Sequence, residues 1–386
     1  MSHAADDARI DFGAWSSGGS CRRPVTLLLA GAARTRCWGL TTDQRIARLA
    51  ARRNHPVARH MGTAPAVIVC NARYWFEAGL IDWCSERPGR AVLDRGHLVV
   101  GHVASREAET VGAAIDRDLP IRSEVREKLS EPAPGMYFAE LAKREEPLVI
   151  RVDEVGCAEA ERRSFRAAYR GITDILTKYV WPVPAFHLTR LMARFGITPN
   201  LVTAFGTACA ILACLLWASG GFVPGLIAAL TWSLGDTVDG KLARCTVRSS
   251  PVGDLFDHGV DVLFPPLAWT AWAIGAGFST SAVALKTTLA CYLVQRLIEL
   301  AFVSATGMQI HHWRPFDARF KLVTAQRNTL IPLAAIALPV AGPAGALRVV
   351  AGWSLCCVLV HAARLAAALG ARLSGESLSP HLSRSG

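Results

Sequence analysis

The sequence contains no cysteine pair of the C-x-x-C type, although it holds 11 cysteines. The cysteines are scattered, and no histidine stands near them at a spacing that suits a zinc site. Cys356 and Cys357 are adjacent, but they lie within an apolar run. We therefore interpret the cysteines as reduced thiols that pack as small hydrophobic side chains.

We expect no signal peptide, and the sequence has no clustered basic run. The opening stretch MSHAADDARIDFGAW has neither the basic nor the apolar segment of a secretory signal. Although the formal net charge is +11, Lys and Arg are dispersed, so nucleic acid is not an expected partner. The mean hydropathy of +0.27 is high for a soluble protein. The positive charge instead suits phosphate-bearing partners or an anionic membrane surface.

Residues 1–150 predict an α/β domain, because strand-like apolar runs alternate with helix-like segments. We expect Thr42 to cap the first helix and EPAPG (131–135) to form a turn or linker. The expected strands cover residues 25–31 and 66–72, followed by RAVLD and HLVVGHV, and the expected helices cover residues 41–53 and 76–86.

Residues 151–199 predict a linker that ends in a juxtamembrane amphipathic helix. In HLTRLMARF (187–195), apolar side chains recur on one helical face and two arginines lie on another. This pattern is typical of a helix that lies along a membrane surface. The apolar positions are Leu188, Leu191, Met192 and Phe195, and the basic positions are Arg190 and Arg194.

Residues 200–372 predict an all-α bundle of six transmembrane helices, followed by a cytoplasmic tail at 373–386. The connections SGGF, GAGFSTS and AGPAGA carry no charge, whereas the loop at 311–328 is basic. The positive-inside rule then predicts a multi-pass protein of the cell (inner) membrane, with both termini and the 311–328 loop in the cytoplasm. The expected spans are 201–218, 221–238, 255–276, 281–304, 329–345 and 347–369.

Carboxylates stand at the cytoplasmic edge of two of these spans. Asp236 and Asp239 are three residues apart, and Asp257 and Asp261 are four apart, so each pair shares one helix face. Four converging carboxylates would repel one another unless cations lay between them. Ligands of oxygen alone suit Mg²⁺ or Mn²⁺, and two such ions suit phosphoryl transfer.

The spacing Asp236-x2-Asp239-Gly240-x2-Ala243-Arg244-x8-Gly253-x3-Asp257-x3-Asp261 resembles the signature of the CDP-alcohol phosphatidyltransferase family. The preceding ITPNLVT (197–203) and the number of spans are also similar to that family. The resemblance implies that an acceptor hydroxyl attacks the β-phosphorus of a CDP-linked donor, that CMP leaves, and that the protein is a homodimer.

The resemblance also implies a role for each residue of the signature. Asp254 matches no position of the signature, and we interpret it as a solvated or capping residue. His258 lies within the stretch, but this chemistry does not need an imidazole. The implied metal ligands are Asp236, Asp239, Asp257 and Asp261, with Asp261 also the general base, and the implied CDP-site residues are Gly240, Ala243, Arg244 and Gly253.

Basic residues of the fourth span and of the 311–328 loop are candidates for binding the acceptor or its phosphate. Arg296 could instead pair with Glu299 three residues later, and the loop arginines could merely reflect the positive-inside rule. Both alternatives stay open. The candidates are Arg296, Arg314, Arg319, Lys321 and Arg327.

Residues 1–150 weakly resemble a nucleotidyltransferase domain that has lost its activity. LLLAGAARTR corresponds to a glycine-rich phosphate loop, but Ala33 and Arg34 stand where a second glycine is needed. Asn71 or Ala72 takes the place of the metal-binding carboxylate. Asp82 and Asp94 remain as weak candidate ligands.

The sequence therefore predicts an integral membrane transferase of phospholipid or polar-lipid synthesis. It moves a phosphatidyl or phospho-alcohol group from a CDP-linked donor to an alcohol acceptor. One alternative is a soluble donor of the CDP-inositol type with a lipid or polyol-phosphate acceptor. Another, from a different class, is a non-catalytic nucleotide-binding membrane scaffold.

Overall fold

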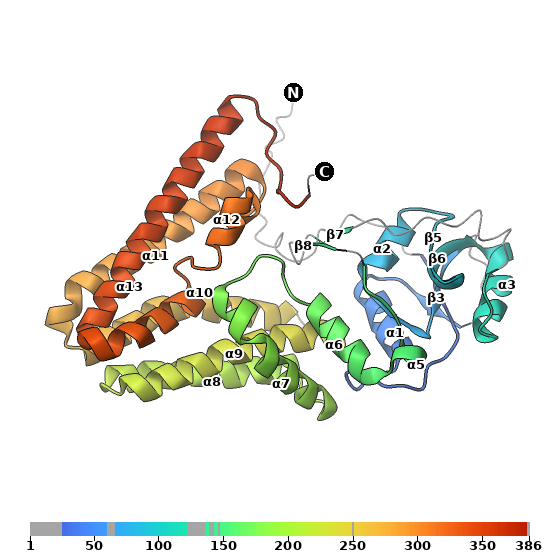
Figure 1. The fold of residues 1–386 in the computed structure, drawn as a ribbon, viewed down its shortest axis with the longest axis horizontal. Helices are drawn as coiled ribbons and strands as arrows, with labels where there is room; N and C mark the ends of the chain where they lie inside the picture. The colour runs from blue at the N-terminus through green and yellow to red at the C-terminus, as the bar shows by residue number, and fades with distance from the viewer. Residues whose placement is uncertain are drawn as a thin grey trace, which may run out of the picture.

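The computed structural model describes residues 25–59, 66–121, 136–138, 143–145, 147–248 and 251–383, and side chains within these ranges except those of 136–138, 144, 145, 251–258 and 261. The chain begins with an α/β region and continues into a helical region, so the predicted fold class is confirmed at that level (Figure 1). The predicted linker at 131–135 lies outside the described residues.

The α/β region is built on a sheet of five strands in the order β2-β1-β3-β6-β5. Strands β2, β1 and β3 run parallel, whereas β6 pairs antiparallel with both β3 and β5. The strands are β1 (Leu27–Ala30), β2 (Val57–Ala58), β3 (Ala66–Asn71), β4 (Tyr74–Phe76), β5 (Ala91–Asp94), β6 (His97–Ala104), β7 (Met136–Phe138), β8 (Lys143–Glu145) and β9 (Val149–Arg151). The helices of this region are α1 (Thr42–Arg52), α2 (Gly79–Ser85), α3 (Ser105–Asp116), α5 (Val152–Val155) and α6 (Cys157–Ala167).

Two boundaries in this region differ from the sequence prediction. Thr41, not Thr42, is the N-cap of α1, because its backbone is still extended and its amide donates to Gln44 Oε1 at 3.1 Å. The second helix was expected from residue 76 but begins at Gly79. Phe76, which was expected in this helix, is instead the last residue of β4, and β4 pairs with β9, a strand much later in the sequence.

The helical region carries the long apolar helices. Its elements are η2 (Leu176–Val180), α7 (Pro182–Arg194), α8 (Pro199–Ala218), α9 (Phe222–Thr246), α10 (Pro251–Gly275), α11 (Phe278–Thr306), η3 (Ile310–His312), α12 (Pro315–Phe320) and α13 (Arg327–Leu373). In α13 the helix is interrupted at Gly342, where φ is +67° and ψ is 177°. This break falls within the uncharged AGPAGA stretch that was expected to separate two spans.

By length and composition, three helices among the described residues, α8, α11 and α13, could cross a membrane. A shorter apolar helical segment covers Val262–Gly275. The buried core of this region contains Trp217, Trp269 and Trp272, whose rings pack against one another. The apolar helices therefore support a membrane protein.

The apolar face predicted for helix α7 is partly packed against the protein and partly exposed. Leu188 and Met192 pack against the protein core, whereas Leu191 and Phe195 are 50% and 74% exposed. On the other side, Arg190 pairs with Glu161 of α6 at 2.7 Å. The helix begins at Pro182, five residues before the stretch 187–195 in which the apolar pattern predicted it. Proline is tolerated in the first turn of a helix, because the N–H that it lacks would have no partner within the helix there.

Trp38 joins the α/β region to the helices that follow it. Its side chain is 2% exposed and belongs to the same buried cluster as Ala193 of α7 and Val238 of α9. Its backbone amide donates to Glu161 Oε1 at 2.9 Å, and its indole Nε1 donates to Ser164 Oγ at 2.8 Å. One side chain thus links the loop after β1 to α6, α7 and α9.

Trp38→Ala is expected to destabilise the protein by about 3 to 5 kcal/mol, since it removes a buried ring and leaves a cavity. The readout is the midpoint of thermal unfolding in neutral detergent. Phe195→Ala, which removes an exposed ring, is the matched control and should cause a much smaller shift. Equal midpoints for the wild type and the Trp38 variant would contradict this role.

Candidate functional site

The candidate site centres on the C-terminal half of α9. Asp236 and Asp239 lie there three residues apart, and Asp239 is 6% exposed. The hydroxyl of Thr203, near the start of α8, donates to Asp239 Oδ2 at 2.6 Å. Thr203 is the last residue of the ITPNLVT stretch, so this stretch supplies a direct contact to the signature.

Arg327, at the start of α13, supplies the positive charge beside Asp236. Its Nη2 lies 2.6 Å from Asp236 Oδ2, and the two side chains are 13% and 21% exposed. The guanidinium also lies over the ring of Trp232, with its Cζ 4.0 Å from the ring centroid. The start of α13 therefore contacts the aspartates of α9. The spacing of the aspartates along α9 could not predict this contact, because Arg327 lies on another helix.

A buried polar network extends from this pair to the segment before α7. Ser233 donates to Asn328 Oδ1 at 2.6 Å, and Asn328 Nδ2 donates to Asp174 Oδ2 at 3.2 Å. The backbone amide and hydroxyl of Thr177 also donate to Asp174, both at 2.8 Å. Sequence reasoning missed these residues. Ser233, a polar residue inside an apolar run, was the available signal.

The two cations of the signature segment both bind one backbone carbonyl. Lys241 Nζ and Arg244 Nε donate to the carbonyl oxygen of Ala168 at 2.9 and 3.1 Å, where α6 ends. Lys241 is 2% exposed, and its Nζ lies 3.0 Å from the centroid of the Tyr169 ring. Arg244 was expected at the CDP site, and in this structure it ties α9 to the C-terminus of α6 together with Lys241.

Gly240 leaves room for Arg244. A Cβ atom at Gly240 would lie 3.3 Å from Arg244 Nη2 and 3.5 Å from Nη1. A larger residue would therefore displace this guanidinium. Ala243, another small position predicted for the CDP site, is partly buried on the same helix.

The second half of the signature lies on α10. The backbone of this helix runs from Pro251 without a break past the last aspartate of the signature. Nothing is described of the side chains at Gly253, Asp254, Asp257, His258 and Asp261. The expectation that the two aspartate pairs converge therefore stays a prediction.

The candidate acceptor residues do not gather into one described cluster. Arg296 pairs with Glu299 at 2.9 Å and is half exposed, and Arg314 lies 3.4 Å from Glu376. Arg319 is exposed. Lys321 is partly buried; desolvation lowers its pKa, and the Glu299 carboxylate opposes part of that shift.

The carboxylate of Asp116, at the end of α3, binds the loop after β1. In a phosphate-binding loop, the backbone amides at this place would be free to bind phosphate. Gly31 adopts φ +75°, and its N–H donates to Asp116 Oδ1 at 2.7 Å. Asn71, which stands where the resemblance expects a metal ligand, donates to the carbonyl of Leu98 and accepts from the amide of Arg73. Asp82 forms two hydrogen bonds with Arg53. Asp94 is the last residue of β5 and is partly buried.

Comparison with known proteins finds similarity in the second half of the chain. Residues 196–367 match the family model described as CDP-alcohol phosphatidyltransferase. No curated protein sequence matches the chain. Among solved structures, a phosphatidylinositol phosphate synthase of Mycobacterium tuberculosis with CDP-DAG bound is 17% identical. The match covers 47% of this chain and 92% of that one, with a TM-score of 0.36.

Proposed function

We propose that the chain transfers a phosphatidyl or phospho-alcohol group from a CDP-linked donor to an alcohol, because residues 196–367 match the family model described as CDP-alcohol phosphatidyltransferase. The reaction releases CMP and serves the synthesis of phospholipids or other polar lipids. The observation that carries this proposal is the pair Asp236 and Asp239 on α9, held by Arg327 and Thr203.

The donor chemistry of these aspartates fits Mg²⁺ or Mn²⁺. Both offer carboxylate oxygens, the ligand type that these hard cations prefer. Among the described side chains, no group of three or more His, Cys, Asp or Glu residues could hold a metal ion. From the spacing of the signature, we propose that Asp257 and Asp261 complete a site for two ions together with Asp236 and Asp239.

In the proposed reaction, Asp261 accepts the proton of the acceptor hydroxyl. The hydroxyl oxygen then forms a bond to the β-phosphorus, and the bond from that phosphorus to the oxygen bridging it to CMP breaks. CMP leaves with the electron pair. Bound divalent metal would supply charge neutralisation at the phosphates. Gly240, Ala243, Arg244 and Gly253 would shape the CDP site.

We also propose the arrangement in the membrane. The apolar helices and the interruption of α13 at Gly342 support six spans across the cell membrane. The basic loop at 311–328 favours a cytoplasmic active site and cytoplasmic termini. The exposed Leu191 and Phe195 suit α7 lying along the inner surface of the membrane. A homodimer is part of the same proposal.

The proposed domains are an α/β domain at 1–150, a linker with the juxtamembrane helix at 151–199, the catalytic membrane domain at 200–372 and a tail at 373–386. We propose that the α/β domain no longer transfers nucleotides. The carboxylate of Asp116 at the Gly31 amide supports this, because an anion in that position repels a phosphate.

The alternative donor is a soluble CDP-alcohol of the CDP-inositol type, with a lipid or polyol-phosphate acceptor. The nucleotidyltransferase-like order of elements in the α/β domain favours it, because such domains make CDP-alcohols. To decide, purified protein is given labelled CDP-diacylglycerol or labelled CDP-inositol or CDP-choline, with a mixture of alcohols and lipids. A new labelled phosphodiester product formed from CDP-diacylglycerol alone supports phosphatidyl transfer, and one formed from the soluble donors alone supports the alternative.

A further inference from the structure

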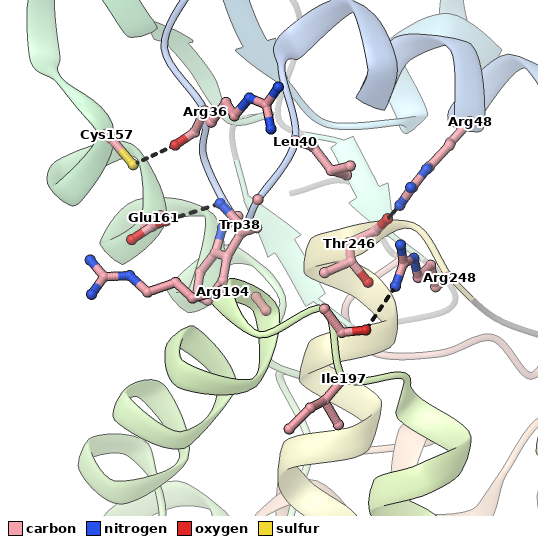
Figure 2. Close-up of a pocket in the computed structure, with 13 residues that line it drawn as sticks. Arg36, Trp38, Leu40, Arg48, Cys157, Glu161, Arg194, Ile197, Thr246 and Arg248 are labelled. Atoms are coloured by element: carbon pink, nitrogen blue, oxygen red, sulfur yellow. Dashed lines mark hydrogen bonds between the residues drawn. The ribbon is translucent and has the colours of Figure 1, made fainter.

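A cavity of about 410 Å³ lies where the α/β region meets the ends of α7 and α9 (Figure 2). Its walls come from the loop after β1, from α1, from α6 and from the C-terminal ends of α7 and α9. None of the described signature residues of α9 lines it. The cavity is therefore separate from the described part of the catalytic site. Its size falls within the range of about 300–1,000 Å³ that is usual for small-molecule pockets.

The cavity is strongly basic. Arg36, Arg48, Arg194 and Arg248 surround it, and Glu161 is the one acidic residue in its lining. The Glu161 carboxylate already pairs with Arg190 at 2.7 Å and accepts the Trp38 amide at 2.9 Å. Its charge is therefore balanced by an arginine outside the lining, and the four lining arginines give the surroundings of the cavity an excess of positive charge.

Two of the arginines are held in place across the junction. Arg48 of α1 donates to the carbonyl of Thr246, at the end of α9, at 2.7 Å. Arg248 donates to the carbonyl of Gly196, after α7, at 3.4 Å. Each guanidinium has five N–H donors, so each retains donors for a ligand.

These two guanidinium groups are close enough to repel each other. Desolvation lowers the pKa of Arg48, and the positive charge of Arg248 lowers it further. Such like charges cost free energy when they stand together, and an anion between them would offset that cost. Guanidinium groups also match phosphate oxygens in geometry, with two parallel N–H donors for each phosphate.

We propose that this cavity binds a phosphate-bearing ligand that bridges the α/β region and the C-terminal end of α9. The ligand is either a soluble phosphorylated molecule or the headgroup of an anionic lipid, and both offer the same phosphate chemistry. Phe195, which follows Arg194 in the chain, is an exposed apolar side chain of the kind that contacts a membrane surface. A ligand here clamps the α/β domain onto the helix that carries Asp236 and Asp239.

The test measures thermal unfolding of the full chain in neutral detergent with EDTA, so that metal-dependent binding at the catalytic site does not contribute. Inorganic phosphate is one probe, and phosphatidic acid or phosphatidylglycerol in mixed micelles is the other. The variants are the double change Arg48→Gln with Arg248→Gln and, as a control, Arg106→Gln, whose side chain is 82% exposed and outside the cavity.

We expect a saturable rise in the unfolding midpoint for the wild type and for Arg106→Gln. The double variant should need at least about tenfold more of the same probe, because two charge-assisted contacts are lost. A response to inorganic phosphate identifies a soluble ligand, and a response to anionic lipid alone identifies a headgroup. No response in the wild type, or an equal response in the double variant, would overturn the proposal.

Two further measurements keep the outcome decisive. If the double variant does not fold, the pair Arg36→Gln and Arg194→Gln replaces it, because both residues are exposed in the structure. Asp239→Asn should retain the phosphate or lipid response while losing CMP release. Failure of the cavity proposal is thus distinguishable from failure of the proposed reaction.

Discussion

Asp261→Asn is expected to lower the rate of CMP release by at least about 100-fold, the usual contribution of a positioned general base. Asparagine keeps the size of the side chain but cannot accept the proton of the acceptor hydroxyl. Binding of the CDP-linked donor should change much less than turnover. The measurement is the rate of CMP release at saturating donor and acceptor.

Asp254→Asn is the matched control for this variant. It makes the same chemical change on the same helix, at a position that the family signature does not use. We expect it to retain nearly full activity. Wild-type CMP release from the Asp261 variant, or equal losses from both variants, would remove Asp261 from its role as the base.

Asp239→Asn is expected to remove metal-dependent turnover and to weaken metal binding. A loss on the order of 100-fold follows if about 2.7 kcal/mol of charge stabilisation disappears. The fold should persist, since the Thr203 hydroxyl can donate to an amide oxygen as it does to Asp239 Oδ2. Activity and the rise in unfolding midpoint caused by Mn²⁺ should both fall.

Asp43→Asn is the control for the Asp239 variant. Asp43 lies on α1 and pairs with the exposed Arg59 at 3.0 Å, away from the signature. This variant should keep both CMP release and the response to Mn²⁺. If the Asp239 variant keeps its full response to Mn²⁺, Asp239 is not a metal ligand.

Local patterns predicted the elements but not the contacts between them. The apolar runs of α8, α9 and α11 could be found from the sequence, because each pattern is complete within one helix. The pairing of β4 with β9 could not, because the partner strand lies more than seventy residues further along the chain. Because Phe76 belongs to β4, α2 begins at Gly79 and not at residue 76 as predicted.

In the candidate site, too, the residues of one helix could be predicted from the sequence, whereas their contacts with other helices could not. Asp236 and Asp239 were predicted, because their spacing is a local signature. Their partners Thr203 and Arg327 come from other helices and are fixed only by tertiary packing. Lys241 and Arg244 both donate to the backbone carbonyl of Ala168. This contact could not be predicted from the sequence, because every residue has a backbone carbonyl.

The most direct test of the central claim is CMP release by the purified protein with a panel of CDP-linked donors and alcohols. Each reaction is run with Mg²⁺, with EDTA, and with Mg²⁺ restored in excess after EDTA. The account predicts CMP release from at least one donor, its loss in EDTA and its recovery with Mg²⁺. Nucleotide binding without CMP release from any donor would contradict it and favour a non-catalytic scaffold.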